Sequence, residues 1–165
     1  SSDVCSSDLS IRYLTSVIDK LENSLSMISP ASSAANADAH ALRARAYLNC
    51  VNEKYKEKQV GTNLVNDDDE VLLSAICDAK RVIHDLSTVS TPASLSIAYR
   101  TWTDAELLLA ERREHQRQQQ KKSRQGKADF SKVVAVLTQW SEAQPMYRTK
   151  LQGEIQKLKA GNVNK

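Results

Sequence analysis

The highest concentration of charge in the sequence lies between Arg112 and Lys127. This run has seven Lys and Arg residues against the single Glu114, a local charge of +6, whereas the rest of the chain sums to −3. A basic stripe along one helix can bind nucleic-acid phosphates without reading their sequence. The candidate phosphate contacts are Arg112, Arg113, Arg117, Lys121, Lys122 and Arg124. The run has no aromatic residue on which a base could stack, so a solvated helical hairpin is the alternative interpretation.

Three further arginines lie in segments that are rich in small and apolar residues: Arg43, Arg45 and Arg100. A guanidinium group can donate two parallel hydrogen bonds to one carboxylate, which suits the recognition of an acidic peptide. These arginines are therefore candidates for binding a partner. The alternative is that they face solvent or pair with acidic residues of the same chain, namely Asp78, Asp104 or Glu106.

The residue types that carry catalysis or bind metals stand apart from one another. His40, His84 and His115 have no second ligand three or four residues away, and we expect all three on the surface or in a groove. The run Asp67-Asp68-Asp69 is not followed by the glycine and distal glutamate of a calcium loop, so we expect it to begin a helix. The three cysteines are widely spaced, which argues against a disulfide framework or a zinc site. We therefore expect neither an enzyme nor a cofactor.

The composition favours an all-α fold, because the 165 residues include only four glycines, three prolines and one phenylalanine. Ser29-Pro30 is expected to end the first helix and Asn36 or Asp38 to cap the second. Thr91-Pro92 and Asp129 are expected to begin two later helices. The apolar spacing predicts six amphipathic helices that bury their apolar stripes on one another, over about 9–28, 37–56, 70–86, 92–122, 129–142 and 145–159.

Two of these segments share small residues, an arginine and an aromatic residue in corresponding places: ALRARAYL at 41–48 and SIAYRTW at 96–102. The first of them resembles the first helix of a tetratricopeptide repeat, and SAICDAKRVI at 74–83 resembles the second helix. The repeats here are longer than the family period of about 34 residues, and the extra residues fall between the two helices of each repeat. The resemblance implies a tetratricopeptide-like α-α superhelix (solenoid) of antiparallel helix pairs.

In this family the first helices line a concave groove. The resemblance therefore implies partner-binding roles for Arg43, Arg45, Asn49 and Arg100, with Asn52 as a further polar candidate. The implied function is a scaffold or adaptor that binds a peptide or helix of another protein. The basic final segment at 147–159 is similar to the helix that precedes the J-domain in some co-chaperones, which implies a chaperone as partner. A nucleic-acid-associated helical protein that uses residues 112–127 is the alternative, and a structural bundle without a groove is a third.

The ends of the sequence differ from its middle. Ser1-Ser2-Asp3 recurs as Ser6-Ser7-Asp8, and residues 1–9 resemble a translated sequencing adapter. We expect the helical domain to span 10–160, with 161–165 as a tail, inside a longer protein. No apolar run approaches the roughly 20 residues of a membrane span, and no signal segment is visible. We expect a cytoplasmic protein, with the nucleus as the alternative, and no membrane partner.

Overall fold

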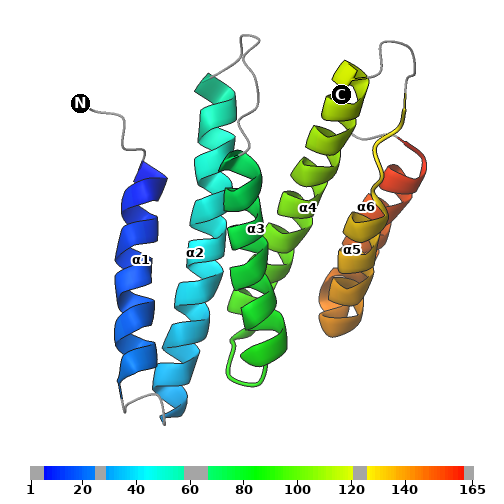
Figure 1. Cartoon of the computed structure of the whole chain (residues 1–165). Helices are drawn as coiled ribbons and strands as arrows, with labels where there is room; N and C mark the ends of the chain where they lie inside the picture. Colours follow the sequence, from blue (N-terminus) through cyan, green and yellow to red (C-terminus); the bar gives the residue numbers. More distant parts are fainter. Residues whose placement is uncertain (1–5, 25–28, 58–66, 121–125, 162–165) are drawn as a thin grey trace. The chain divides into compact units, whose positions relative to one another are not determined.

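The computed structural model describes residues 6–24, 29–57, 67–120 and 126–161, and every regular element among them is helical (Figure 1). The all-α prediction is confirmed, whereas the tetratricopeptide-like superhelix stays a prediction. The chain divides into two compact units, Ser1–Trp102 and Thr103–Lys165, and the division falls inside helix α4 (Pro92–Gln120). No helix in the described part of the chain is long and apolar enough to cross a membrane.

The first unit is built around helix α2 (Pro30–Glu57). Helix α1 (Ser6–Asn23) packs on one side of it and helix α3 (Asp67–Lys80) on another, and the three run antiparallel to their neighbours in the chain (Figure 1). The face of α2 that they cover is rich in alanine, which lets the neighbouring helices approach closely. The buried residues of this core include Ile18, Ala37, Ala41, Ala44, Leu48, Val51, Leu72, Ala75, Ala79 and Val82.

Helix α2 begins seven residues earlier than the apolar pattern predicts. Pro30 is its first residue, and Oγ of Ser29 caps it by accepting a hydrogen bond from the amide of Ser32 (3.1 Å). The predicted caps are wrong because both lie inside the helix. Asn36 is fully buried, and Asp38 accepts a hydrogen bond from the hydroxyl of Ser94 at the start of α4.

Helix α1 is also displaced from its predicted span of 9–28. It begins at Ser6 and ends at Asn23, while residues 25–28 lie outside the described residues. Residues 6–9, which were expected to lie outside the helical domain, form the first turn of α1. Ser7 Oγ donates a hydrogen bond to Glu53 Oε1 (3.0 Å), and Cys50 Sγ lies 3.3 Å from Asp8 Oδ1. Helix α1 therefore begins before residue 10, the expected start of the helical domain.

The predicted helix over 70–86 consists of α3 and a π-helical turn, η2 (Arg81–Asp85). The turn is π-helical because the amide of Leu86 donates to the carbonyl of Arg81, five residues back (3.0 Å). The expectation that the three aspartates begin this helix is confirmed, since α3 starts at Asp67. The start of α4 is confirmed as well, because Thr91 Oγ1 accepts the amide of Ser94 (3.1 Å) and Pro92 opens the helix.

The second unit contains the later part of α4, helix α5 (Ser131–Ala143), a 3₁₀ turn η3 (Pro145–Tyr147) and helix α6 (Arg148–Lys159). The N-cap residue of α5 is Phe130, which makes no side-chain capping bond, so the predicted cap at Asp129 is one residue too early. Asp129 still lies beside the start of the helix, where its Oδ1 accepts a hydrogen bond from the amide of Ser131 (3.0 Å). This hydrogen bond lowers the pKa of Asp129. Helices α5 and α6 pack against each other through buried Val133, Val136, Leu137, Trp140, Leu151 and Ile155.

Candidate functional site

A buried polar cluster lies on the face of α2 that meets α1 and α3. Asn36, His40 and Arg43 are four and three residues apart and therefore share one side of the helix. His40 is 3% exposed and Asn36 is fully buried. This corrects the expectation that His40 lies on the surface or in a groove, whereas His84 and His115 are exposed as expected.

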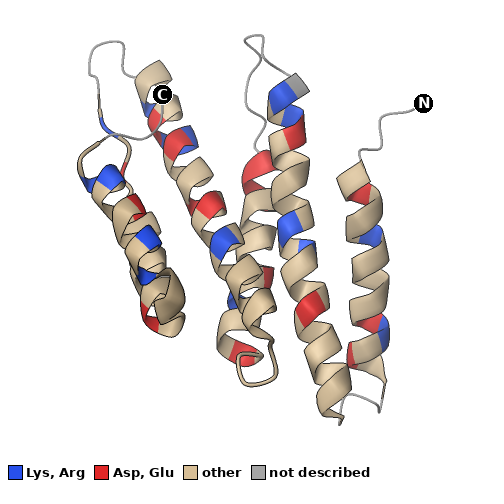
Figure 2. Ribbon diagram, turned by 180° about the vertical axis from the view of Figure 1, so that it is seen from behind, with Lys and Arg blue, Asp and Glu red and all other residues tan. Residues whose placement is uncertain are grey.

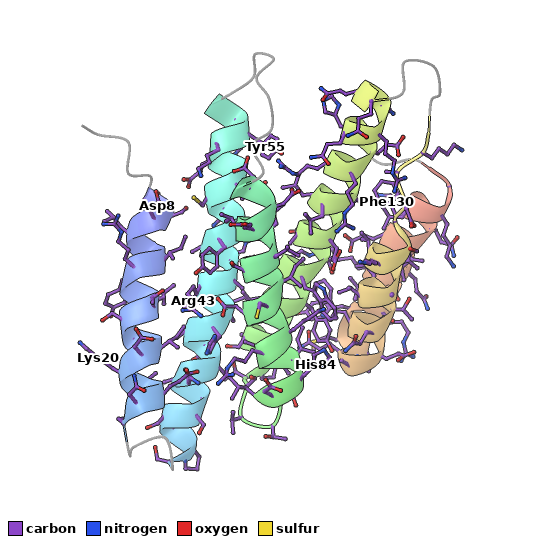
Figure 3. The ribbon with its side chains drawn as sticks, in the orientation of Figure 1. Asp8, Lys20, Arg43, Tyr55, His84 and Phe130 are labelled. Atoms are coloured by element: carbon purple, nitrogen blue, oxygen red, sulfur yellow. The ribbon has the colours of Figure 1, made fainter. Side chains whose placement is uncertain are left out.

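Arg43 forms a bidentate ion pair with Asp78 of α3. Its Nε lies 2.7 Å from Oδ2 and its Nη2 lies 2.8 Å from Oδ1, while Nη1 reaches Thr15 Oγ1 of α1 at 3.3 Å. Arg43 itself lies near the middle of α2 (Figure 3). The hydrogen bonds to Asp78 raise the pKa of Arg43. Burial by itself would raise the pKa of Asp78, but the hydrogen bonds from Arg43 and His40 outweigh burial and lower it. The alternative that Arg43 pairs with Asp78 is confirmed, so Arg43 joins three helices instead of lining a groove.

The His40 ring lies between carboxylates from two different helices. Its Nδ1 is 3.0 Å from Asp78 Oδ1, and its Nε2 is 3.0 Å from Glu22 Oε1 of α1. The same oxygen of Glu22 accepts from Asn36 Nδ2 (3.3 Å) and from Arg81 Nη2 (3.0 Å). Burial would raise the pKa of Glu22, but these neighbours together lower it. One buried imidazole therefore connects α1 to α3 through α2.

A hollow of about 360 Å³ lies on a different side of α2, between it and α1. Arg45 and Asn49, two of the predicted partner-binding residues, line it together with Tyr13, Leu14 and Leu42, beside Ser7, Ser10 and Ala46. The α2 residues of this set are spaced three, four and seven apart, so they share one face of the helix, and Arg43 is not among them. Successive helix positions turn by about 100°, which separates residues 43 and 45 by about 200°.

Two further predicted contacts lie elsewhere. Arg100 lies on α4, is partly buried and has an interaction of its own within the protein, and it is not among the residues that line the α1–α2 hollow. Asn52 is exposed on α2, also outside this lining. The sequence pattern missed Tyr13 and Leu42, whose exposure depends on how α1 meets α2.

Of the predicted phosphate contacts, Arg112, Arg113 and Arg117 lie among the residues that the structure describes. Arg112 is only 3% exposed and has an interaction of its own within the protein, which corrects its assignment as a phosphate contact. Arg113 is exposed, and Nη1 of Arg117 lies 3.6 Å from Oε2 of Glu114. Lys121, Lys122 and Arg124 lie outside the described residues. Acidic and basic residues both occur along the described part of α4 (Figure 2).

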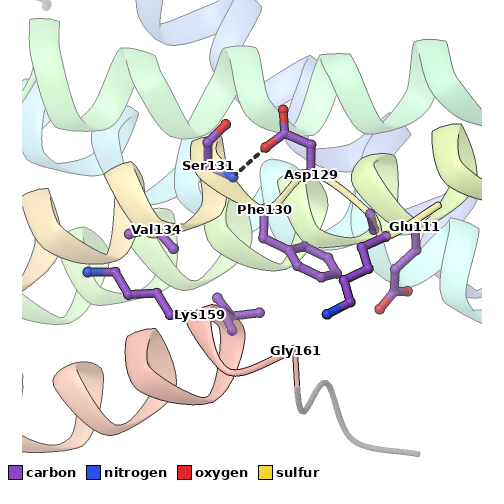
Figure 4. A pocket seen from close by; sticks show the side chains of 10 residues that line it. Glu111, Asp129, Phe130, Ser131, Val134, Lys159 and Gly161 are labelled. Carbon is purple, nitrogen blue, oxygen red and sulfur yellow. Dashed lines mark hydrogen bonds between the residues drawn. The ribbon is translucent and has the colours of Figure 1, made fainter.

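The second unit has a larger hollow, about 800 Å³, beside the start of α5 and the end of α6 (Figure 4). Phe130, Val134 and Leu158 form its apolar lining. Its charged lining consists of two carboxylates and two amines, so the charge selects neither an anion nor a cation: Glu111, Asp129, Lys127 and Lys159. Glu111 is exposed at the rim of this hollow, and its partial burial there raises its pKa.

Among the described residues, no group of three His, Cys, Asp or Glu side chains is arranged to hold a metal ion. Comparison of the chain with protein-family models, with curated proteins and with solved structures gives no match. The geometry therefore leaves two features of the first unit with a specific chemistry, the buried polar cluster around His40 and the hollow between α1 and α2.

Proposed function

We propose that the first unit is a protein-interaction module, and that the hollow between α1 and α2 binds a short acidic peptide segment of a partner protein. One observation carries this proposal. Arg45 and Asn49 line the same hollow as Tyr13 and Leu42, which are 70% and 48% exposed. Large exposed apolar side chains beside an arginine are typical of the centres of protein–protein interfaces.

The lining defines the chemistry of the segment. Tyr13, Leu14 and Leu42 offer an apolar surface for one side chain of the partner. Arg45 has five N–H donors, so it can donate to a partner carboxylate in addition to its contact within the protein. The amide of Asn49 can bond to a peptide group. An apolar residue next to an aspartate or glutamate satisfies all three features.

The volume of the hollow favours a peptide over a helix. About 360 Å³ lies near the lower end of the range of roughly 300–1,000 Å³ for ligand pockets, so it accommodates one or two side chains. A whole docked helix would need a longer groove with anchors at three- and four-residue spacing.

The wider proposal for the chain is a tetratricopeptide-like superhelix that acts as a scaffold or adaptor, as in co-chaperones of the cytoplasm. Packing between helices that follow each other in the chain supports this proposal, for α2 with α3 and for α5 with α6. The nucleic-acid alternative has less support, because Arg112 is buried and Arg117 lies beside Glu114.

The test selects displayed random peptides on the immobilised protein and measures their affinity by calorimetry. We expect enrichment of an acidic residue beside an apolar one, and at least a tenfold loss of affinity in Arg45→Glu and in Leu42→Asp. Arg12→Glu is the matched control, because Arg12 is exposed on α1 and does not line the hollow.

Equal peptide affinity of the Arg45→Glu and Arg12→Glu variants would refute the hollow as the binding site. RNA binding that depends on Arg113 and Arg117 and not on Arg45, with no selected peptide, would replace the proposal by the nucleic-acid alternative.

A further inference from the structure

Both ring nitrogens of His40 have a carboxylate as partner. Both ring nitrogens lie 3.0 Å from carboxylate oxygens, Nδ1 from Asp78 and Nε2 from Glu22. A carboxylate only accepts hydrogen bonds, and a neutral imidazole has a single N–H. The imidazolium form alone donates to both neighbours, whereas the neutral ring turns a lone pair towards one carboxylate.

Every element packed around His40 contributes a charged group to this cluster. Glu22 comes from α1, Asp78 from α3 and Arg81 from η2, and Arg43 lies on α2 itself. With a protonated ring, three cations face two carboxylates, and with a neutral ring the charges balance. Histidine is the residue type whose charge changes near neutral pH.

The two contacts of His40 differ in how easily they break. The side chain of Asp78 is 7% exposed and is bound by the guanidinium group of Arg43 (Nε to Oδ2, 2.7 Å). The side chain of Glu22 is 33% exposed, and that of its other partner Arg81 is 43% exposed. Glu22 and Arg81 can therefore move into solvent together, whereas Asp78 cannot.

We propose that Glu22, His40 and Asp78 form a proton-dependent clasp, which holds the C-terminal half of α1 against α2 while the His40 ring carries both protons and releases it when Nε2 loses its proton to water. The Nδ1–H donor to Asp78 stays in place during this step. Nε2 then presents a lone pair to Glu22, and the Glu22 side chain turns outward with Arg81.

The release is local and does not unfold the unit. Ile18 of α1 remains in the core (2% exposed), and Ser7 Oγ still bonds Glu53 at the opposite end of α1. In residues 15–23, Glu22 no longer contacts His40 of α2. Helices α2 and α3 stay joined by the ion pair between Arg43 and Asp78. The α1 residues that line the hollow are Ser7, Ser10, Tyr13 and Leu14, all outside 15–23, so peptide binding should persist when the clasp opens. That consequence rests on the proposed function, and the clasp itself does not.

The experiment follows the ring and the helix in parallel on the full chain. Proton–nitrogen spectra of the His40 ring report its protonation between about pH 5.5 and 8.5. Amide hydrogen exchange, corrected for its intrinsic pH dependence, reports the protection of residues 15–23. We expect this protection to fall at least about tenfold as Nε2 loses its proton, while the protection of α5 stays constant.

Two variants separate the clasp from a general effect of pH on packing. Glu22→Gln has an amide that can donate to a neutral Nε2, so α1 should stay protected over the whole range. His40→Gln has one donor end and one acceptor end, so α1 should be weakly protected at every pH. His115→Gln, which changes an exposed histidine on α4, is the matched control and should behave as the unmodified protein.

Three results would overturn the clasp. The first is constant protection of residues 15–23 while the ring loses its proton, and the second is a ring that keeps one protonation state throughout. The third is an unchanged pH dependence in Glu22→Gln. Absence of peptide binding at every pH refutes the proposed function and leaves the exchange result to decide the clasp.

Discussion

Replacing Asp78 by asparagine tests whether the buried cluster stabilises the first unit. The substitution keeps the shape of the side chain and removes its charge. Asp78 accepts two hydrogen bonds from Arg43, at 2.7 and 2.8 Å, and lies 3.0 Å from Nδ1 of His40. Because each of these involves a charged group, the carboxylate is the electrostatic centre that joins α2 to α3.

The size of the effect follows from these contacts. Hydrogen bonds to charged groups contribute about 1.5–3 kcal/mol each to stability. Loss of all three would therefore lower the free energy of unfolding by about 5–9 kcal/mol at most. An asparagine oxygen still accepts from one donor, and the Arg43 side chain, 17% exposed, recovers part of its hydration. We therefore expect Asp78→Asn to lower the free energy of unfolding by about 3 kcal/mol, near the value for breaking a buried ion pair.

Urea unfolding at neutral pH, followed by circular dichroism, measures this loss. Asp85→Asn is the matched control, since Asp85 is exposed in η2 and should change the free energy of unfolding by less than about 0.5 kcal/mol. In the double variant Asp78→Asn with Arg43→Met, the buried cation is absent, so the total loss should be smaller than the sum of the single losses by about 1 kcal/mol or more. A loss in Asp78→Asn no larger than that of the control, or strict additivity in the double variant, would refute the argument.

Three further predictions concern acid stability, a destabilising carboxyl group and the core. The pKa values of Glu22 and Asp78 are lowered from ordinary values of 4.5 and 3.8, so their stabilisation is present above those values and is lost as the pH falls through the lowered ones. Acid unfolding followed by fluorescence should therefore show a weaker pH dependence in Asp78→Asn, and an unchanged acid transition would contradict this. The pKa of Glu111 is raised from 4.5 by burial, so its ionised form is disfavoured in the fold, and Glu111→Gln should raise the melting temperature at pH 7 but not below pH 4.5. An equal effect at both pH values would show that the cause is not the charge. Leu48→Ala should lower the free energy of unfolding in urea by about 2–5 kcal/mol, because Leu48 is 1% exposed. Leu42→Ala should lower it by less than about 1 kcal/mol, because Leu42 is 48% exposed. Similar losses in the two variants would mean that the two leucines share one environment.

The helices themselves were largely predictable, because the signals that begin and end them are local. Thr91-Pro92 starts α4, as these residue types indicate, and Asp129 bonds the first amide of α5 from just before its N-cap residue. The start of α2 was not predictable in this way. Ser29, Asn36 and Asp38 are all good capping residues, and only the packing of the Asn36 face against α1 decides that the helix begins before it.

The candidate site was predictable in part. Arg45 and Asn49 do line a hollow beside apolar side chains, although the resemblance to tetratricopeptide repeats suggested them together with Arg43. The prediction for Arg112 failed, because this arginine is buried. A basic run in the sequence does not tell which of its residues the fold will bury. The burial of a long side chain depends on its neighbours in space and not on its neighbours in the chain.

The residue types of this sequence by themselves determined an all-helical protein with few breakers, because helix propensity, caps and apolar spacing act over a few residues. Only the tertiary structure decided what Arg43, Arg45 and His40 do. Residues 43 and 45 are separated by a rotation of about 200° around α2. Arg43 therefore meets α3 and pairs with Asp78, whereas Arg45 lines the hollow. The same packing places His40 between Glu22 and Asp78, which are 56 residues apart in the chain. No periodicity within α2 could have located those two carboxylates.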